Sequence, residues 1–162
     1  MLIEAILRRS RFSNLSLVMV DGWMKPGERA ETLWGTTPVT LRGPCPQDRI
    51  GELYGEFDVL LAPSLWPESY GLVTREALFF GKWVVASALG AIGDCVVEGE
   101  NGFRVDLAEP QALARVLERL DSDPQRYTTP PPQSGDLRGA GDQAAELLAL
   151  YRSVIDGTNR RP

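Results

Sequence analysis

Two short apolar runs with a helical stretch between them constrain the fold of this chain most strongly. The runs are DVLLAPS (residues 58–64) and WVVAS (residues 83–87), and the stretch between them, GLVTREALFFG, closes at Gly81. Continuous apolar strands are typical of parallel sheets that helices cover on both faces. A glycine directly after a helical stretch is a common helix end. The sequence therefore predicts an α/β fold, a parallel sheet sandwiched by helices.

The same alternation extends over most of the chain. Further helices are expected over residues 2–9, 27–33, 47–56, 91–99 and 109–121, and further strands over residues 15–20, 38–43 and 101–105. Beyond residue 121 a stretch rich in proline and polar residues predicts a linker, and residues 140–155 predict an amphipathic helix that needs a docking surface. We therefore expect a packed domain over residues 1–125, followed by a linker and a helix over residues 126–162.

The composition argues against several classes of function. The 162 residues carry a net charge of −5 and no dense lysine or arginine cluster, so a nucleic-acid surface is not expected. The chain has no histidine, which removes the usual zinc ligand and the most common general base. No apolar run reaches the roughly 18 residues that span a bilayer, and no signal-peptide pattern opens the chain. These features predict a cytoplasmic protein.

Two glutamates, Glu68 and Glu76, are separated by seven residues where the first apolar strand gives way to the helix. On one straight helix they would lie roughly 12 Å apart along the axis and about 80° apart around it, too far to hold one small ligand. If the loop extends to Gly71 and the helix begins near Leu72, Glu68 folds back over the first turn, on which Glu76 lies. Ligands bind beyond the carboxyl ends of such strands, where this helix start would offer unpaired N–H groups to an anion.

The segment DVLLAPSLWPESYGLVTREALFFGKWVVAS, followed by LGAIGDCVVEGENGFRV, resembles a known family. It is similar to the C-terminal, donor-binding domain of GT-B glycosyltransferases, in particular family four, the glycosyl transferases group 1. The resemblance runs from about Leu2 to Asp121 and includes the spacing of the two glutamates, the PS and VAS strand ends and the NG turn. It implies a Rossmann-like domain that binds a nucleoside diphosphate sugar.

The resemblance assigns roles to individual residues. Glu68 matches the glutamate beside the donor sugar and its reacting centre, and Glu76 matches the one that accepts hydrogen bonds from the ribose hydroxyls. The backbone of the intervening run faces the sugar and the diphosphate. The donor-binding residues that we predict in this run are Ser69, Tyr70, Gly71, Leu72 and Val73.

Three other loops match the family's donor site by their order in the chain. Gly22 in VDGWM stands where the family has a glycine-rich turn, and Arg42 and Gly43 in RGPCP occupy the loop that faces the base. Gly90 and Ala91 in LGAIGD match the loop that lines the sugar pocket. Ala91 replaces a glycine of the family pattern, so the resemblance leaves the sugar open.

One part of the family pattern is not found in this chain. Family members carry, before the helix that matches residues 2–9, a strand with a GR step and then KG, whose arginine and lysine clamp the diphosphate. They also carry an N-terminal acceptor domain. We expect the chain to be a fragment or a natural short form that is inactive alone. A parallel sheet without its first strand would leave an unpaired edge or a gap.

The resemblance implies a retaining sugar transfer from a nucleoside diphosphate sugar to an acceptor hydroxyl, with no metal and no further cofactor. The acceptor would be a glycan or a lipid-linked glycan held by the N-terminal domain, in cell-surface polysaccharide synthesis, with the full-length protein at the inner face of the membrane. One alternative is a non-catalytic module that binds a nucleotide sugar or serves as a scaffold. The nucleotide-sugar 2-epimerases share the two-domain layout but need a histidine near the cleft, which this chain lacks.

Overall fold

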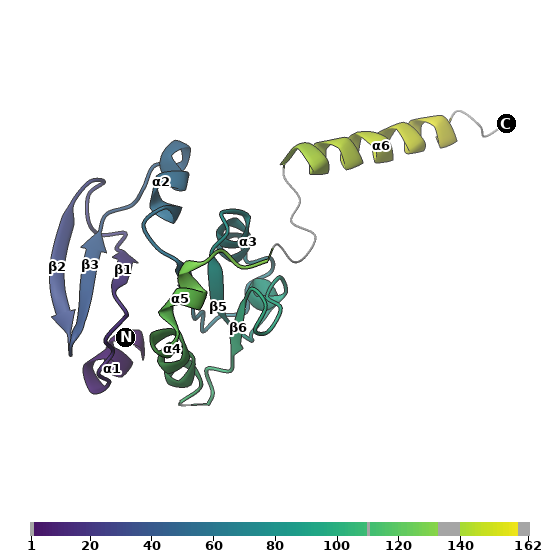
Figure 1. Ribbon diagram of the computed structural model, residues 1–162. Helices are drawn as coiled ribbons and strands as arrows, with labels where there is room; N and C mark the ends of the chain where they lie inside the picture. The colour runs from purple at the N-terminus through teal and green to yellow at the C-terminus, as the bar shows by residue number, and fades with distance from the viewer. Residues whose placement is uncertain (1, 110, 133–139, 159–162) are drawn as a thin grey trace.

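The computed structural model describes residues 2–109, 111–132 and 140–158 (Figure 1). Two three-stranded sheets form its centre, with strand orders β1-β3-β2 and β4-β5-β6. Helices pack around both sheets, and a last helix projects away from them. The predicted α/β fold with parallel strands and covering helices is confirmed, although the strands are divided between two sheets.

The first sheet follows helix α1 (Leu2–Arg9) and is built from β1 (Leu17–Val20), β2 (Arg29–Trp34) and β3 (Thr37–Arg42). Strand β1 runs parallel to β3, whereas β2 and β3 form an antiparallel hairpin. Helix α1 packs beside the hairpin turn, where Gly35 has a φ of 64° and a Cβ would lie 2.5 Å from the carbonyl oxygen of Leu7. A glycine is therefore required at this close approach.

Residues 27–33 were predicted as a short helix, and this prediction is wrong. They form most of β2, whose first five residues are exposed while Trp34 is buried. The stretch has no continuous apolar stripe with which a helix could pack, and its backbone groups are instead paired with β3 through the hairpin. This non-local pairing outweighs the local helix preference of the glutamates and the alanine.

The second sheet contains the elements around the two glutamates. A 3-10 turn (Gln47–Arg49) and helix α2 (Ile50–Tyr54) lead into β4, and another 3-10 turn (Ala91–Gly93) precedes β6. The other elements are β4 (Val59–Ala62), α3 (Leu72–Phe79), β5 (Trp83–Ser87) and β6 (Gly102–Val105). All three strands are parallel, and the central strand β5 is buried along its whole length. The continuous apolar character of WVVAS thus reflects burial on both faces.

Two apolar clusters cover the two faces of the second sheet. One contains Trp83 and Phe103 packed against α4 (Ala112–Ser122), and the other contains Leu78 of α3. Helix α5 (Pro124–Thr128) belongs to the packed domain as well, because Tyr127 is buried and the Trp83 indole N–H donates to the carbonyl of Thr129 at 2.8 Å. The packing therefore continues beyond residue 125, where we expected the linker to begin.

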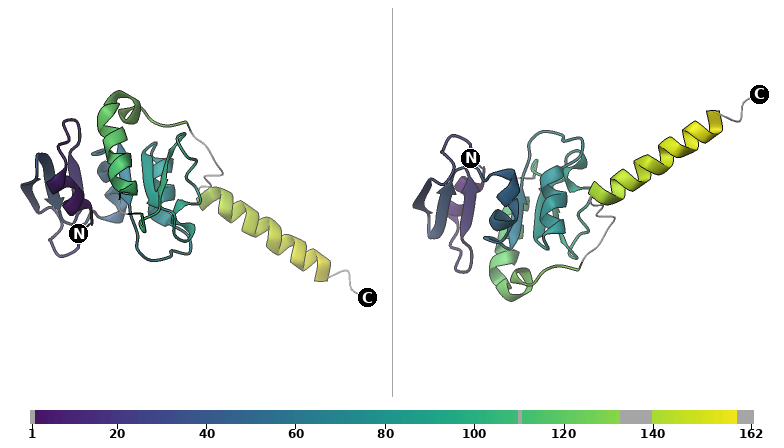
Figure 2. Two further views of the ribbon diagram at one scale, coloured as in Figure 1. Left: turned by 90° about the horizontal axis from the view of Figure 1, so that it is seen from below. Right: turned by 90° about the horizontal axis from the view of Figure 1, so that it is seen from above.

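The two sheets do not join within the described residues. Strands β1 and β4 are the facing outer strands, and a cavity of about 710 Å³ is lined by both of them. Figure 2 shows the first three strands lying to one side of the teal strands β5 and β6. We call this space the inter-sheet cavity.

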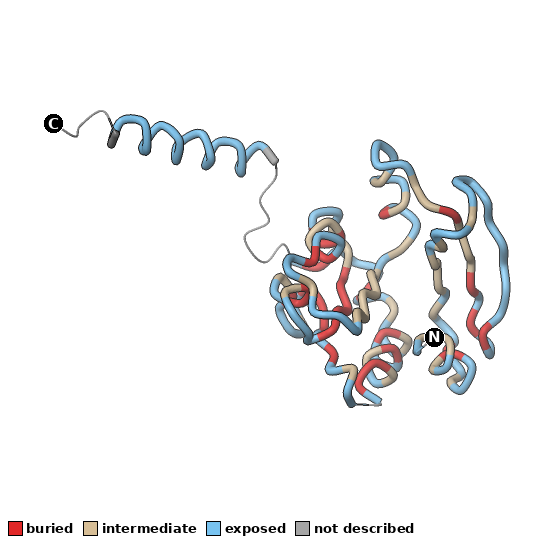
Figure 3. The backbone as a smooth tube through the Cα atoms, turned by 180° about the vertical axis from the view of Figure 1, so that it is seen from behind, coloured by how far each residue is buried: buried red, intermediate tan, exposed pale blue. Residues whose placement is uncertain are grey.

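Helix α6 (Ala140–Thr158) covers the predicted final helix. It extends away from the rest of the molecule, and Figure 3 shows it exposed along its length. The side chains of Leu147, Leu148, Tyr151 and Ile155, which we expected to dock, are more than half exposed. No helix in the described part of the chain has the length and hydropathy that a bilayer crossing requires.

Candidate functional site

Helix α3 begins where the sequence predicted, directly after a left-handed glycine. Gly71 has a φ of 67°, and α3 starts at Leu72. A Cβ on Gly71 would lie 2.6 Å from the Cα of Ile92, so the helix start is packed against the loop that follows β5. The Thr74 hydroxyl fixes this contact, because it lies 2.8 Å from the carbonyl oxygens of both Gly71 and Ile92.

The N-terminal amides of α3 have no acceptor among the described residues. The Arg75 N–H donates to the carbonyl of Gly71, and no side chain caps the helix. The N–H groups of Leu72, Val73 and Thr74 therefore remain available, as the geometry of a helix start requires. Because Leu72 and Val73 are exposed, this tip of the helix is open to an anion.

The loop that carries Glu68 is fixed against the loop that carries Gly90 and Ala91. The Ala91 N–H donates to the carbonyl of Glu68 at 2.7 Å. A Cβ on Gly90 would lie 2.7 Å from the backbone N and O of Glu68, so only glycine allows this approach. The two loops after β4 and β5 therefore share one edge of the sheet, as predicted, and Glu68 is partly exposed there.

Glu76 lies in the second turn of α3, one residue beyond the first turn in which we expected it. Its carboxylate accepts a hydrogen bond from the Tyr54 hydroxyl at 3.1 Å, and that hydroxyl lies 3.3 Å from the carbonyl of Val73. Burial and the negative charge of Glu76 raise the pKa of Tyr54 well above its usual range. Tyr54 therefore stays protonated and orients the carboxylate as a donor.

Sequence reasoning did not find Tyr54. Its ring is buried and stacks on Phe80 at 4.7 Å between ring centroids. The available signal was a tyrosine within the helical stretch 47–56, because a buried tyrosine hydroxyl needs a partner. Its partner comes from α3, 22 residues further along the chain, and the local pattern does not identify it.

Tyr70 and Arg75 form a pair beside the start of α3. The Arg75 guanidinium donates to the carbonyl of Tyr70 and lies 4.1 Å from the centroid of the Tyr70 ring. Ser69 and Tyr70 are both exposed. A positive charge is thus held next to the open amides of the helix tip, where an anion would be attracted to both.

The remaining predicted residues lie at the strand ends of the first sheet, where Arg42 ends β3, Gly43 follows it and Gly22 follows β1. Gly22 is exposed with open space around it, whereas Gly43 is buried and its N–H donates to the carbonyl of Glu28. The Arg42 guanidinium lies 2.6 Å from the Glu56 carboxylate. These three residues therefore lie at the first sheet, whereas Glu68 and Gly71 lie in the loop that follows β4 of the second sheet.

The Glu56 carboxylate forms ion pairs with both Arg42 and Arg29. Partial desolvation raises the pKa of Glu56, but the hydrogen bonds and charges of Arg42 and Arg29 outweigh it, and the net shift is downward. Because the pKa of Glu56 is lower in the folded state than in the unfolded state, the ionised carboxylate stabilises the fold at pH values above the unfolded pKa. This stabilisation is lost as the pH falls through the folded pKa.

We therefore expect Glu56→Gln to lower the free energy of unfolding by about 1 kcal/mol at pH 7, since the carboxylate is partly exposed. Urea denaturation at pH 7 and pH 3 measures this, and the difference from the wild type should shrink at pH 3. Glu52→Gln is the control, because Glu52 pairs with Arg49 at the surface. If Glu56→Gln lowers the free energy of unfolding equally at pH 7 and pH 3, the ion pairs of Glu56 do not account for the effect.

No metal site emerges from the described residues, in which no group of three or more Cys, Asp or Glu side chains is placed to hold an ion. The site consists of open helix amides, two carboxylates and one paired arginine. These groups are suited to bind an anion that also carries hydroxyl groups.

Comparison with known proteins identifies the family of this chain. The family model of the glycosyl transferases group 1 matches residues 1–130. The chain belongs to this family. The family resemblance of the sequence is confirmed, and the match includes both sheets and the start of α3.

The curated relatives are considerably longer than this chain. This chain is 34% identical over 129 residues to D-inositol 3-phosphate glycosyltransferase 1 of Catenulispora acidiphila. The matched region covers 76% of this chain and 30% of the relative. The chain is 36% identical over 130 residues to the D-inositol 3-phosphate glycosyltransferase of Corynebacterium urealyticum, covering 78% of the chain and 30% of the relative. The chain thus spans about a third of the length of these family members.

Solved structures share the fold. The match to sucrose-phosphate synthase from Thermosynechococcus elongatus covers 96% of this chain and 42% of the synthase chain, with a TM-score of 0.72 and 23% identity. The match to Anabaena Alr3699/HepE, solved in complex with UDP and glucose, covers 71% of this chain and 33% of the HepE chain, with a TM-score of 0.57 and 30% identity. The first likeness shows that the chain has the fold of a GT-B glycosyltransferase domain.

Proposed function

We propose that this chain is the donor-binding part of a retaining glycosyltransferase and holds a nucleoside diphosphate sugar at the edge where the loops after β4 and β5 meet. The observation that carries the proposal is the uncapped start of α3, which lies between Glu68 and Glu76 in the sequence. The diphosphate lies at the open amides of Leu72 and Val73, because a helix N-terminus stabilises negative charge.

The two carboxylates take different parts of the donor. Glu76 accepts hydrogen bonds from the ribose hydroxyls, since a carboxylate offers several acceptor sites to neighbouring hydroxyls. Glu68 lies beside the sugar, where it orients the ring and stabilises positive charge that develops at the anomeric carbon during transfer. The bond between the anomeric carbon and the diphosphate oxygen breaks, and the acceptor oxygen bonds to that carbon from the same face. The hydroxyl proton passes to the departing diphosphate, and the configuration is retained.

The departing diphosphate needs positive charge, and α3 supplies it. The helix tip contributes its amides, and Arg75 contributes a cation held over the ring of Tyr70. We therefore propose that donor binding requires no metal ion. The acceptor, a glycan or a lipid-linked glycan, is held by polypeptide outside this chain, and the complete protein works in the cytoplasm at the inner face of the membrane.

Calorimetric titration of the chain with UDP and with 2′,3′-dideoxy-UDP tests the ribose contact. We expect weak binding of UDP and a loss of about tenfold or more in affinity for Glu76→Gln, because a hydrogen bond to a charged group contributes about 1.5–3 kcal/mol. The variant should also lose the preference for UDP over the dideoxy analogue. Adding EDTA should leave the affinity unchanged.

A second variant and a control make this test specific. Tyr54→Phe removes the donor that orients Glu76, so it should weaken UDP binding less than Glu76→Gln does. Glu118→Gln changes an exposed glutamate on α4 and should bind UDP like the wild type. Equal losses for UDP and for the dideoxy analogue in Glu76→Gln would place the ribose elsewhere.

A further inference from the structure

Two of the four tryptophans of this chain lie in its core, and the other two are largely exposed. Trp34 and Trp83 are buried, whereas Trp23 is 98% exposed and Trp66 is 79% exposed. Trp66 stands two residues before Glu68, in the loop that follows β4. Tryptophan side chains are usually buried for most of their surface, so an exposed indole beside a candidate site is informative.

The backbone of Trp66 is held in place by Ser64. The Ser64 hydroxyl donates to the carbonyl of Trp66 at 3.0 Å and accepts from the Trp66 N–H at 3.3 Å. Ser64 is itself tied to the end of β4, because its N–H donates to the carbonyl of Ala62. The indole is therefore presented from an ordered loop, and ordering it against a ligand costs little conformational entropy.

The side chains of Trp66 and Glu68 leave the loop on the same side. A residue before a proline is restricted to extended conformations, which applies to Trp66 before Pro67. Glu68 forms a parallel β-bridge with Gly90, so it is extended as well. In an extended chain, side chains two residues apart point to one face, and their Cα atoms are roughly 7 Å apart. The indole and the carboxylate are therefore neighbours.

A second aromatic side chain stands beyond the carboxylate. Tyr70 follows Glu68 by two residues and is also exposed, but the Arg75 guanidinium lies over its ring. No ring or cation contact covers the indole of Trp66 in the part of the chain that the structure describes. Trp66 therefore supplies the open aromatic face of this loop.

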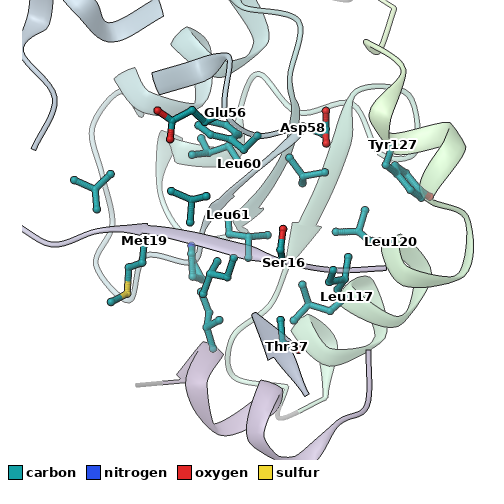
Figure 4. Close-up of a pocket in the computed structure, with 18 of the residues that line it drawn as sticks. Ser16, Met19, Thr37, Glu56, Asp58, Leu60, Leu61, Leu117, Leu120 and Tyr127 are labelled. Carbon is teal, nitrogen blue, oxygen red and sulfur yellow. The ribbon is translucent and has the colours of Figure 1, made fainter. Parts of the chain in front are cut away.

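This indole does not belong to the inter-sheet cavity. The cavity is bordered by Met19, Leu61 and Leu120, among others (Figure 4). Among residues 63–71, all of which the structure describes, Pro63 and Leu65 line it. Trp66 therefore lies outside the cavity, where a ligand at the edge of the second sheet can reach it.

An open indole beside a carboxylate suits a six-membered ring with hydroxyl groups around its edge. When its substituents are equatorial, such a ring presents C–H groups on its faces, which pack against an aromatic side chain, and its edge hydroxyls donate to a carboxylate. A purely apolar ligand would desolvate Glu68 without giving it a donor, and an anion would meet its negative charge.

We propose that Trp66 is a stacking platform for a six-membered polyol ring of the acceptor. The inference rests on the proposed function, in which the donor extends from Glu68 to the start of α3. Trp66 precedes Glu68 in the loop, whereas α3 follows it, so the indole lies beside the reacting centre at about the width of one sugar ring. A ring stacked there brings a hydroxyl to the anomeric carbon, and polypeptide outside this chain holds the rest of the acceptor.

Titration of the isotope-labelled chain with methyl β-D-glucopyranoside tests this inference, because each tryptophan gives one indole N–H signal in the NMR spectrum. The substituents of this glucoside are all equatorial. We expect the Trp66 signal to shift to saturation and the Trp23 signal to stay in place. Trp23 is the internal control, because it is more exposed but lies in a turn in which its own N–H donates to the Asp21 carboxylate.

Two further ligands define the chemistry that is recognised. Sorbitol carries hydroxyl groups without a ring face and should shift neither signal. myo-Inositol shares the chemistry of the glucoside, so the tighter of these two ligands tells whether the acceptor ring is a cyclitol or a pyranose.

Variants of the two exposed tryptophans measure the contribution of the ring. Trp66→Ala should weaken glucoside binding about tenfold, followed by the backbone amide signals of the loop, because it removes the stacking surface. Trp66→Phe should recover part of the affinity. Trp23→Ala should bind the glucoside like the wild type.

Parallel titrations with UDP and UDP-glucose separate this inference from the proposed function. Trp66→Ala should bind both nucleotides like the wild type, because the donor lies on the other side of Glu68. If the wild type fails to bind UDP while the glucoside still shifts the Trp66 signal, the donor site is wrong and the sugar contact of Trp66 is confirmed.

Three results would overturn the inference. An unchanged Trp66 signal at saturating glucoside would show that the indole holds no sugar, even if UDP binds as proposed. Equal shifts of the Trp23 and Trp66 signals would show unspecific stacking on exposed rings. A loss of affinity for UDP-glucose but not for UDP in Trp66→Ala would assign the ring to the donor sugar.

Discussion

Gly71→Ala should lower the free energy of unfolding by about 3 kcal/mol, because a left-handed residue with a Cβ costs about 1–2 kcal/mol and a backbone clash adds to it. The new Cβ would lie 2.6 Å from the Cα of Ile92. Since the contact is with backbone, relief requires the loop after β5 to move away from α3. The movement would also separate Glu68 from Ala91, so UDP binding should be lost as well.

Urea denaturation followed by circular dichroism measures the effect on stability. Gly22→Ala is the matched control, because a Cβ at Gly22 meets nothing within 4 Å. That variant should unfold like the wild type. If Gly71→Ala is as stable as the wild type, the start of α3 is not held against the loop after β5. The proposed donor site would then lack the contact that fixes its two loops.

Phe103→Ala should destabilise the chain by about 3–5 kcal/mol, the usual cost of removing a large aromatic side chain from a core. Phe103 is 2% exposed and lies within 6.5 Å of both the Trp83 and the Tyr127 rings, measured between centroids. The Arg119 guanidinium lies 4.9 Å from the centroid of the same ring. Few of these neighbours can close the resulting cavity, because Trp83 is fixed by its hydrogen bond to Thr129.

The same urea experiment, with tryptophan fluorescence as its signal, reports on this core. Phe79→Ala is the comparison, since Phe79 is 62% exposed and the change should stay within about 0.5 kcal/mol. A small effect of Phe103→Ala would show that α5 does not pack on β5 and β6, and that the packed domain ends near residue 125 after all.

The start of α3 was predictable because its signals are local. A glycine follows a polar loop, and an apolar helical stretch begins at the next residue. The buried strands were predictable for a similar reason, since WVVAS has apolar character on both faces. The assignment of Glu68 and Gly90 to one edge of the sheet followed from the parallel order of the strands.

The missed features depend on pairing between distant residues. The strand Arg29–Trp34 is held by its hairpin with β3, so its polar sequence alone did not show it. Tyr54 obtains its role from Glu76, and Arg42 is engaged by Glu56. Each of these partners lies on another element, and no periodicity within one segment records the contact.

The phenol of Tyr54 orients the carboxylate of Glu76 before any ligand arrives. Its hydroxyl uses one of the several acceptor positions of that carboxylate, and its ring is fixed by the stack on Phe80. If Glu76 accepts the ribose hydroxyls as proposed, the ligand meets a carboxylate whose direction a neighbouring helix has already set. The rigidity with which α2 holds this phenol would then contribute to the affinity for a nucleotide.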